Sequence, residues 1–332
     1  MKPLTPLLLS VLLSILLLAV FFVSLSIGSA PISVCAGLTD WITGKDSLEA
    51  LILREIRLPR TLLALSVGAA LGISGAALQG LLRNPLADPS LTGASQGAAL
   101  GAASVFYFGF FPAAGALAPA LAGLIGAGLT LLGMLFLAGS GRPALILMAG
   151  LAVSSLAGAA LAAVLNFAPN PFAMQELVFW LLGSVAERGM PHLLFLLPAL
   201  VIGILILWRE RRLLAALSLG EQVATSLGLD YRRGGRRLIL GVAILVGAAV
   251  SVAGNIGFVG LIAPHLARPL ARHHPDRLLF PSAILGAALV VLADMLARLM
   301  PPGREIRLGV LTAFIGAPLF IRLIWKDRKQ WL

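Results

Sequence analysis

The sequence predicts an all-α, polytopic membrane protein with about ten transmembrane helices and both termini in the cytoplasm. The 332-residue chain is 59% hydrophobic and 12% charged, with a mean hydropathy of +0.99, whereas an ordinary soluble domain carries about 25% charged residues. In lipid only helices and closed barrels satisfy every backbone amide and carbonyl. The apolar stretches at 7–23, 61–81 and 238–252 lack the alternation of barrel strands, so helices are expected.

Ten apolar segments of helix length follow one another along the chain. They lie at about 4–28, 60–82, 92–112, 115–138, 143–166, 190–208, 238–254, 256–271, 279–300 and 306–325. The segment at 256–271 is short for a bilayer, and joining it to the preceding one would give nine spans and move the C-terminus across the membrane. We expect residues 1–332 to form a single transmembrane domain.

Basic residues set the orientation, because Lys and Arg accumulate in cytoplasmic loops. With the N-terminus inside, 17 of the 25 basic residues are cytoplasmic, including seven arginines between 209 and 237. Nine spans would place the last basic residues outside and weaken this bias, which favours ten. Topology therefore explains the net charge of +11, and no basic patch interleaved with aromatic residues indicates nucleic acid as a partner.

Three interruptions are longer than simple turns. Residues 29–59 form an outer loop, 172–189 are expected to hold an outer interfacial helix, and 209–237 form a basic cytoplasmic loop. Within that last loop, residues 220–228 have the pattern of a short amphipathic helix. Glu221 near its start complements the helix dipole, and Gly228 is typical of a C-cap.

Pairs of small residues at four-residue spacing predict close helix packing in lipid. The pairs are Gly68 and Gly72, Gly97 and Gly101, Ala122 and Gly126, and Gly150 and Ser154.

Several functions find no support in the residues. None of the four lysines follows a G-x4-G pattern, so ATP hydrolysis requires another polypeptide. The single cysteine excludes an internal disulfide. Few charges fall inside the spans, which argues against an ion-driven secondary transporter. An intramembrane enzyme is disfavoured because paired carboxylates and an H-E-x-x-H zinc site are missing from the spans.

Eight segments in order along nearly the whole chain resemble the FecCD-type, or type II, permeases of bacterial ABC importers for iron chelates, haem and cobalamin. They are residues 57–60 (RLPR), 75–79 (GAALQ), 84–89 (NPLADP), 93–98 (GASQGA), 220–228 (GEQVATSLG), 257–265 (GFVGLIAPH), 293–298 (ADMLAR) and 308–318 (LGVLTAFIGAP).

The resemblance implies a transport subunit of the bacterial inner membrane that performs no chemistry and binds no cofactor or metal. Its expected partners are a second copy in a homodimer, or a related copy in a heterodimer, two ABC ATPase subunits that hold ATP and magnesium, and a periplasmic or lipid-anchored binding protein. An iron–siderophore is the expected substrate, with haem and cobalamin as alternatives, moved by ATP-driven alternating access.

The resemblance also assigns roles to residues. Arg57, Arg60 and Arg298 match the positions that dock the binding protein. Asn84 and Leu86, together with the turn of Arg142, Pro143 and Ala144, match the cytoplasmic gate. The segment containing Gly220, Glu221, Ala224 and Gly228 is similar to the coupling helix that fits a groove on the ATPase.

Overall fold

A computed structural model shows a helical bundle and describes residues 6–28, 30–139, 143–167, 171–272, 274–300 and 306–331. The described residues contain helices and no strands. The α-helices are α1 (Pro6–Ser26), α2 (Val34–Ile42), α3 (Leu48–Leu51), α4 (Leu58–Leu82), α5 (Ala94–Phe108), α6 (Ala118–Ala138), α7 (Pro143–Asn166), α8 (Pro171–Leu181), α9 (Met190–Arg209), α10 (Arg211–Leu217), α11 (Glu221–Ser226), α12 (Tyr231–Ala253), α13 (Val259–Ala267), α14 (Pro275–Arg298) and α15 (Leu308–Trp331). Three short elements join them: a π-helix, η1 (Ile52–Arg57), and two 3₁₀-helices, η2 (Pro89–Thr92) and η3 (Pro112–Leu117).

Seven helical stretches in the described residues are long and apolar enough to cross a bilayer. They are Leu8–Ser26, Leu48–Leu82, Pro112–Ala138, Met148–Asn166, Met190–Arg209, Tyr231–Ala253 and Pro275–Arg298. Each of the ten predicted segments coincides with a helix, and the prediction of an all-helical, multi-span chain is confirmed. The other three helices are shorter in their apolar part: α5 has 15 residues, α13 has nine, and the apolar part of α15 is Leu308–Arg322.

Helix α13 departs most from its predicted length. Its nine residues span about 14 Å at 1.5 Å per residue, less than half the roughly 30 Å of a hydrocarbon core. Residues 254–258 before it are not helical, and Phe258 has a left-handed backbone with φ 67°. The predicted segment 256–271 is therefore a half-helix, α13, preceded by a non-helical segment at 254–258.

The centre of the bundle is formed by α4, α12 and α14, most of whose surface is buried, whereas α1, α7 and α9 expose most of theirs. Backbones approach very closely here. A Cβ added to Gly72 of α4 would lie 2.1 Å from the carbonyl oxygen of Ser282 on α14. The pairs Gly68/Gly72 and Gly97/Gly101 thus allow close helix packing as predicted, α4 against α14 and α5 against α6.

The predicted loops contain more helix than expected. Helix α3, η1 and α4 form one continuous helical stretch from Leu48 to Leu82. The π-turn falls just before Pro59, which has no N–H to bond the carbonyl four residues earlier. The outer helix predicted at 172–189 is shorter than expected, because α8 ends at Leu181.

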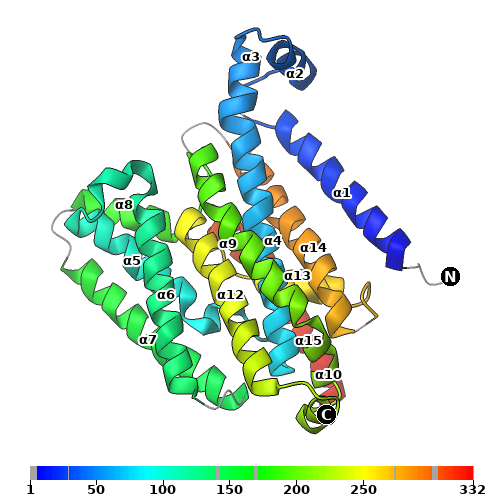
Figure 1. Cartoon of the computed structure of the whole chain (residues 1–332). Helices are drawn as coiled ribbons and strands as arrows, with labels where there is room; N and C mark the ends of the chain where they lie inside the picture. The colour runs from blue at the N-terminus through cyan, green and yellow to red at the C-terminus, as the bar shows by residue number, and fades with distance from the viewer. Residues whose placement is uncertain are drawn as a thin grey trace.

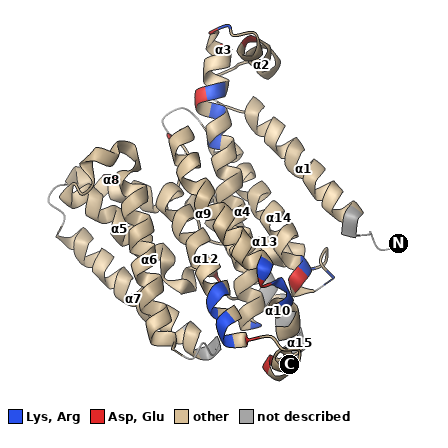
Figure 2. Cartoon of the chain, viewed as in Figure 1, with Lys and Arg blue, Asp and Glu red and all other residues tan. Residues whose placement is uncertain are grey.

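Charged residues gather at the two ends of the bundle, and the middle is almost free of them (Figure 2). One end carries α2, α3 and the start of α4, and the other carries α10, α11 and the start of α12 (Figure 1). This distribution is the one that a bilayer imposes on a helical bundle.

Candidate functional site

Two of the three arginines predicted to dock a binding protein, Arg60 and Arg298, bind one carboxylate, that of Asp294 on α14, and Arg57 lies nearby. Arg60 donates from Nε to Oδ1 of Asp294 at 2.9 Å, and Arg298 donates from Nε to Oδ2 at 2.7 Å. Asp294 is completely buried. Two guanidinium groups therefore compensate a charge that water does not reach, as a buried carboxylate requires.

The same cluster fixes the C-terminal end of α1 to the bundle. Arg298 donates to the carbonyl oxygen of Ser24 at 3.0 Å, and Arg57 donates to that of Leu25 at 2.7 Å. Arg57 is 4% exposed and Arg298 6%. These guanidinium groups point into the protein, so they have a structural role whatever else they bind.

Asp294 was not among the predicted site residues. The signal for it was an acidic residue inside an apolar span, one helical turn before Arg298.

At the opposite end, the Asn-Pro turn follows α4. The Oδ1 atom of Asn84 accepts a hydrogen bond from the amide of Leu86 at 2.9 Å, and both side chains are exposed. Leu86 also lines a 260 Å³ cavity together with residues of α13 and α15, among them Leu261 and Phe320. Asn84 thus supports the turn, while Leu86 faces a cavity.

The second part of the predicted gate is described only in part. Arg142 lies outside the described residues, and Pro143 and Ala144 form the first turn of α7. No role can be read from their side chains, so this part of the gate stays a prediction.

The predicted amphipathic helix is present as α11. Gly220 precedes it with φ 112°, Glu221 lies in its first turn, and Gly228 follows its C-cap with φ 75°. A left-handed glycine just past a helix end is the expected terminator. Ala224 is fully buried and anchors the helix against the bundle.

The exposed side of this segment is mixed, with the polar side chains Gln222, Thr225 and Ser226 beside three apolar ones. Leu219 is 69% exposed and Leu227 64%, and Val223 between them is also exposed. These side chains lie at the strongly charged end of the molecule, where an apolar surface is open to binding by another protein.

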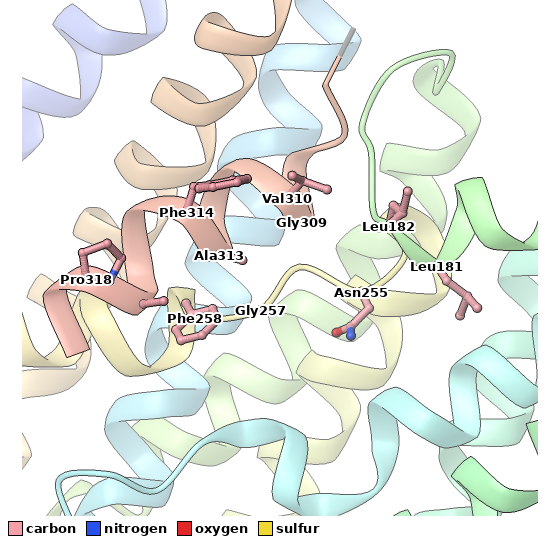
Figure 3. A pocket seen from close by; sticks show the side chains of 11 residues that line it. Leu181, Leu182, Asn255, Gly257, Phe258, Gly309, Val310, Ala313, Phe314 and Pro318 are labelled. Carbon is pink, nitrogen blue, oxygen red and sulfur yellow. The ribbon is translucent and has the colours of Figure 1, made fainter. Parts of the chain in front are cut away.

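Two apolar cavities flank the unwound backbone at 254–258. The larger, of 630 Å³, is lined by the end of α8, by this backbone and by α15. Figure 3 shows Phe258, Val310 and Phe314 around it, with Asn255 as a polar side chain among them. The other cavity, of 310 Å³, shares Asn255, Gly257 and Phe258. Irregular backbone at membrane depth is tolerated where it lines a cavity, and in transporters such breaks accompany the substrate route.

A third cavity, of 490 Å³, is also lined by α8 and is polar. Phe179 and Trp180 of α8 line it, and so do Arg188 and Arg307. Burial lowers the pKa of Arg188, the nearby positive charge of Arg307 lowers it further, and Glu187 partly offsets both. Helix α8 therefore contributes to the wall of an apolar cavity and to that of a charged one.

No group of three or more His, Cys, Asp and Glu side chains in the described residues is placed to bind a metal ion.

Comparison with known proteins agrees with this geometry. Residues 16–326 match the model of the FecCD transport family. The hemin transport system permease protein HmuU of Yersinia pestis is 38% identical over 325 residues, which cover 94% of this chain and 95% of that protein. The vitamin B12 import system permease protein BtuC of Vibrio cholerae is 41% identical over 289 residues, covering 86% of each.

Another relative is named for a different iron compound. The Fe(3+) dicitrate transport system permease protein FecD of Escherichia coli is 36% identical, covering 92% of this chain and 94% of that protein. A solved chain described as a metal-chelate type ABC transporter in an inward-facing conformation superposes with a TM-score of 0.83 at 32% identity, covering 96% of this chain and 98% of the other. On this match of family model, relatives and fold, the chain belongs to the FecCD transport family of ABC importer permeases.

Proposed function

We propose that this chain carries an iron–siderophore across the bacterial inner membrane as one half of a homodimeric, binding-protein-dependent ABC importer. The observation that carries the proposal is the 630 Å³ apolar groove beside the unwound backbone at 254–258. Its lining of Leu, Val, Phe, Ala and Gly suits a bulky chelate that is held weakly and released again. Haem and cobalamin are the alternatives, since relatives named for each are similar to this chain.

Residues of one chain line the groove, and one side of the groove is open. We place the second copy of the chain at this open side. In this arrangement α8 and α15 of the two copies enclose the route. Ten spans with both termini in the cytoplasm are part of the proposal, with α13 as a half-helix that completes the eighth crossing together with residues 254–258.

ATP-driven alternating access then requires one docking surface at each end. At the cytoplasmic end, α11 is the coupling helix. Its apolar side chains Val223 and Leu227 are exposed, and we expect them to enter a groove of a separate ATPase subunit. Asn84 and Leu86, with the turn at 142–144, form the cytoplasmic gate.

At the outer end, Arg57, Arg60 and Arg298 dock a soluble binding protein. Arg60 and Arg298 share the carboxylate of Asp294, and Arg57 lies close enough to act on the charge of Arg298, so these four groups together carry an excess of two positive charges. Such an excess attracts and orients an acidic partner even though the guanidinium groups are largely buried.

Uptake by a strain that depends on this permease tests the substrate. Cells producing the chain with an ABC ATPase and a substrate-binding protein of the same importer class receive, in parallel, a hydroxamate siderophore–iron complex, ferric citrate, hemin or cyanocobalamin. We expect accumulation of the siderophore iron alone. Accumulation of hemin or cobalamin instead would move the assignment to that alternative, and uptake without the ATPase would contradict an ABC mechanism.

A further inference from the structure

A cavity of 190 Å³ lies between α1, α9 and α14 at the basic end of the bundle. Helix α1 packs chiefly on α14, and its N-terminal half diverges from the other helices (Figure 1). The cavity lies in the wedge that this divergence creates. Its walls include Leu9 and Leu13 of α1 and Phe280 of α14.

The inner wall of the wedge is apolar. Leu13 is buried and Phe280 is 39% exposed, while on the outer side of α1 Leu8 and Leu12 are each 46% exposed. In a bilayer, such a space at the edge of the bundle is filled by hydrocarbon.

The rim of the wedge is cationic. Arg272 and Arg277 line the same cavity and are exposed. Arg277 forms no side-chain hydrogen bond or ion pair with any of the described residues, although the acidic residue Asp276 is its neighbour in sequence. One free cation, Arg277, therefore lines the same cavity as the apolar wall.

An aromatic side chain marks the level of the membrane interface. Trp208 of α9 lines the cavity, and the guanidinium carbon of Arg211 lies 5.0 Å from the centre of its ring. Tryptophan is enriched where hydrocarbon meets headgroups, and basic pockets between helices on the cytoplasmic side bind anionic lipid headgroups.

We propose that this wedge is a binding site for an anionic phospholipid of the cytoplasmic leaflet. Arg272 and Arg277 bind the headgroup phosphate, and one acyl chain lies along α1 against Leu9, Leu13 and Phe280. Charge complementarity selects an anionic lipid over a zwitterionic one. The apolar wall selects a lipid over a free phosphate ion, which would leave the wall uncovered.

The test measures lipid binding to the purified full-length chain by native mass spectrometry, in a titration with phosphatidylglycerol or phosphatidylcholine of identical acyl chains. We expect at least a tenfold preference for phosphatidylglycerol. The double variant R272Q/R277Q should lose at least fivefold in affinity for it, while R232Q/R233Q, which removes two exposed cations at the start of α12, should bind as the unaltered chain does.

Two further variants and a competition with inorganic phosphate distinguish binding of the headgroup from binding of the acyl chain. The charge reversal R277E, at an exposed position, gives a second probe should the double variant fold poorly. L13N should lower the affinity for both lipids, because it places a polar side chain in the apolar wall. Equal binding of the two lipids, full binding by both R272Q/R277Q and R277E, or complete displacement by millimolar inorganic phosphate would each overturn the proposal. The readout does not involve transport, so it stands or fails separately from the proposed substrate.

Discussion

The substitution Asp294→Asn probes the strongest buried interaction in the bundle. Asp294 accepts hydrogen bonds from Arg60 through Oδ1 and from Arg298 through Oδ2. An asparagine has one acceptor oxygen, and its NH₂ group would face a guanidinium donor in either orientation of the amide. The variant therefore keeps two buried cations and removes their counter-charge. It also places the amide NH₂ of the asparagine, a donor, against a guanidinium N–H, which is a donor as well.

The magnitude follows from burial. Removing one partner of a buried ion pair costs about 3–5 kcal/mol, and Asp294 is completely buried while Arg298 is 6% exposed. At 1.4 kcal/mol per factor of ten, the lower figure corresponds to a roughly 150-fold change in the unfolding equilibrium. Glu55→Gln serves as the matched control, because Glu55 and its partner Arg54 are exposed and such pairs contribute about 0–1 kcal/mol.

The assay is reversible unfolding in mixed micelles with increasing SDS, followed by tryptophan fluorescence or circular dichroism. A double-mutant cycle with Arg298→Gln should give a coupling free energy above about 1 kcal/mol, as for residues in one network. A loss below 1 kcal/mol for Asp294→Asn, equal to that of Glu55→Gln, would show that the cluster is hydrated, and the reasoning from burial would be refuted.

The remaining predictions concern helix packing and the coupling helix. Gly72→Ala should destabilise the bundle by about 1–3 kcal/mol through overpacking, because its Cβ would meet a carbonyl of α14. The control Gly128→Ala, whose Cβ would have no atom within 4 Å, should be neutral or stabilising by up to about 1 kcal/mol. The same SDS titration measures both variants. Leu227→Asp should reduce co-purification of the ATPase at least tenfold without changing thermal stability, and Gln222→Asp on the same segment should bind it normally. Gly254→Ala should lower stability by about 1–3 kcal/mol, since Gly254 has φ 72° and its Cβ would lie 2.1 Å from the carbonyl of Trp180; unchanged unfolding would mean that the backbone at 254–258 adapts freely.

Much of the fold could be predicted because its signals are local. Apolar length predicted the helices, and four-residue spacing of small residues predicted close helix packing, whereas the partners, α4 with α14 and α5 with α6, are known only from the structure. Glu221 and Gly228 bracket α11 as expected, because capping depends on a few neighbouring residues.

The unwound backbone at 254–258 had no such signal. Within a uniformly apolar stretch, the helical periodicity that marks a soluble helix is lost, and Gly257 and Pro264 are compatible with both a kinked and a broken helix. The orientation of Arg60 depends on Asp294, which lies 234 positions further along the chain. Only the folded structure brings that pair together.

The two proposed docking ends are joined by the most tightly packed pair of helices. Helix α14 carries Asp294 and Arg298 at its C-terminal end, and it contacts α10, next to the proposed coupling helix α11; α4 contacts α10 as well. Between these ends, backbone-to-backbone contact at Gly68 and Gly72 leaves no space for α4 and α14 to slide or bend separately. We therefore expect the pair to move as one rigid body, so that displacement of α11 by an ATPase is transmitted to the arginine cluster beneath the binding protein. We expect the exposed helices, α1 above all, to move in response to the α4–α14 pair.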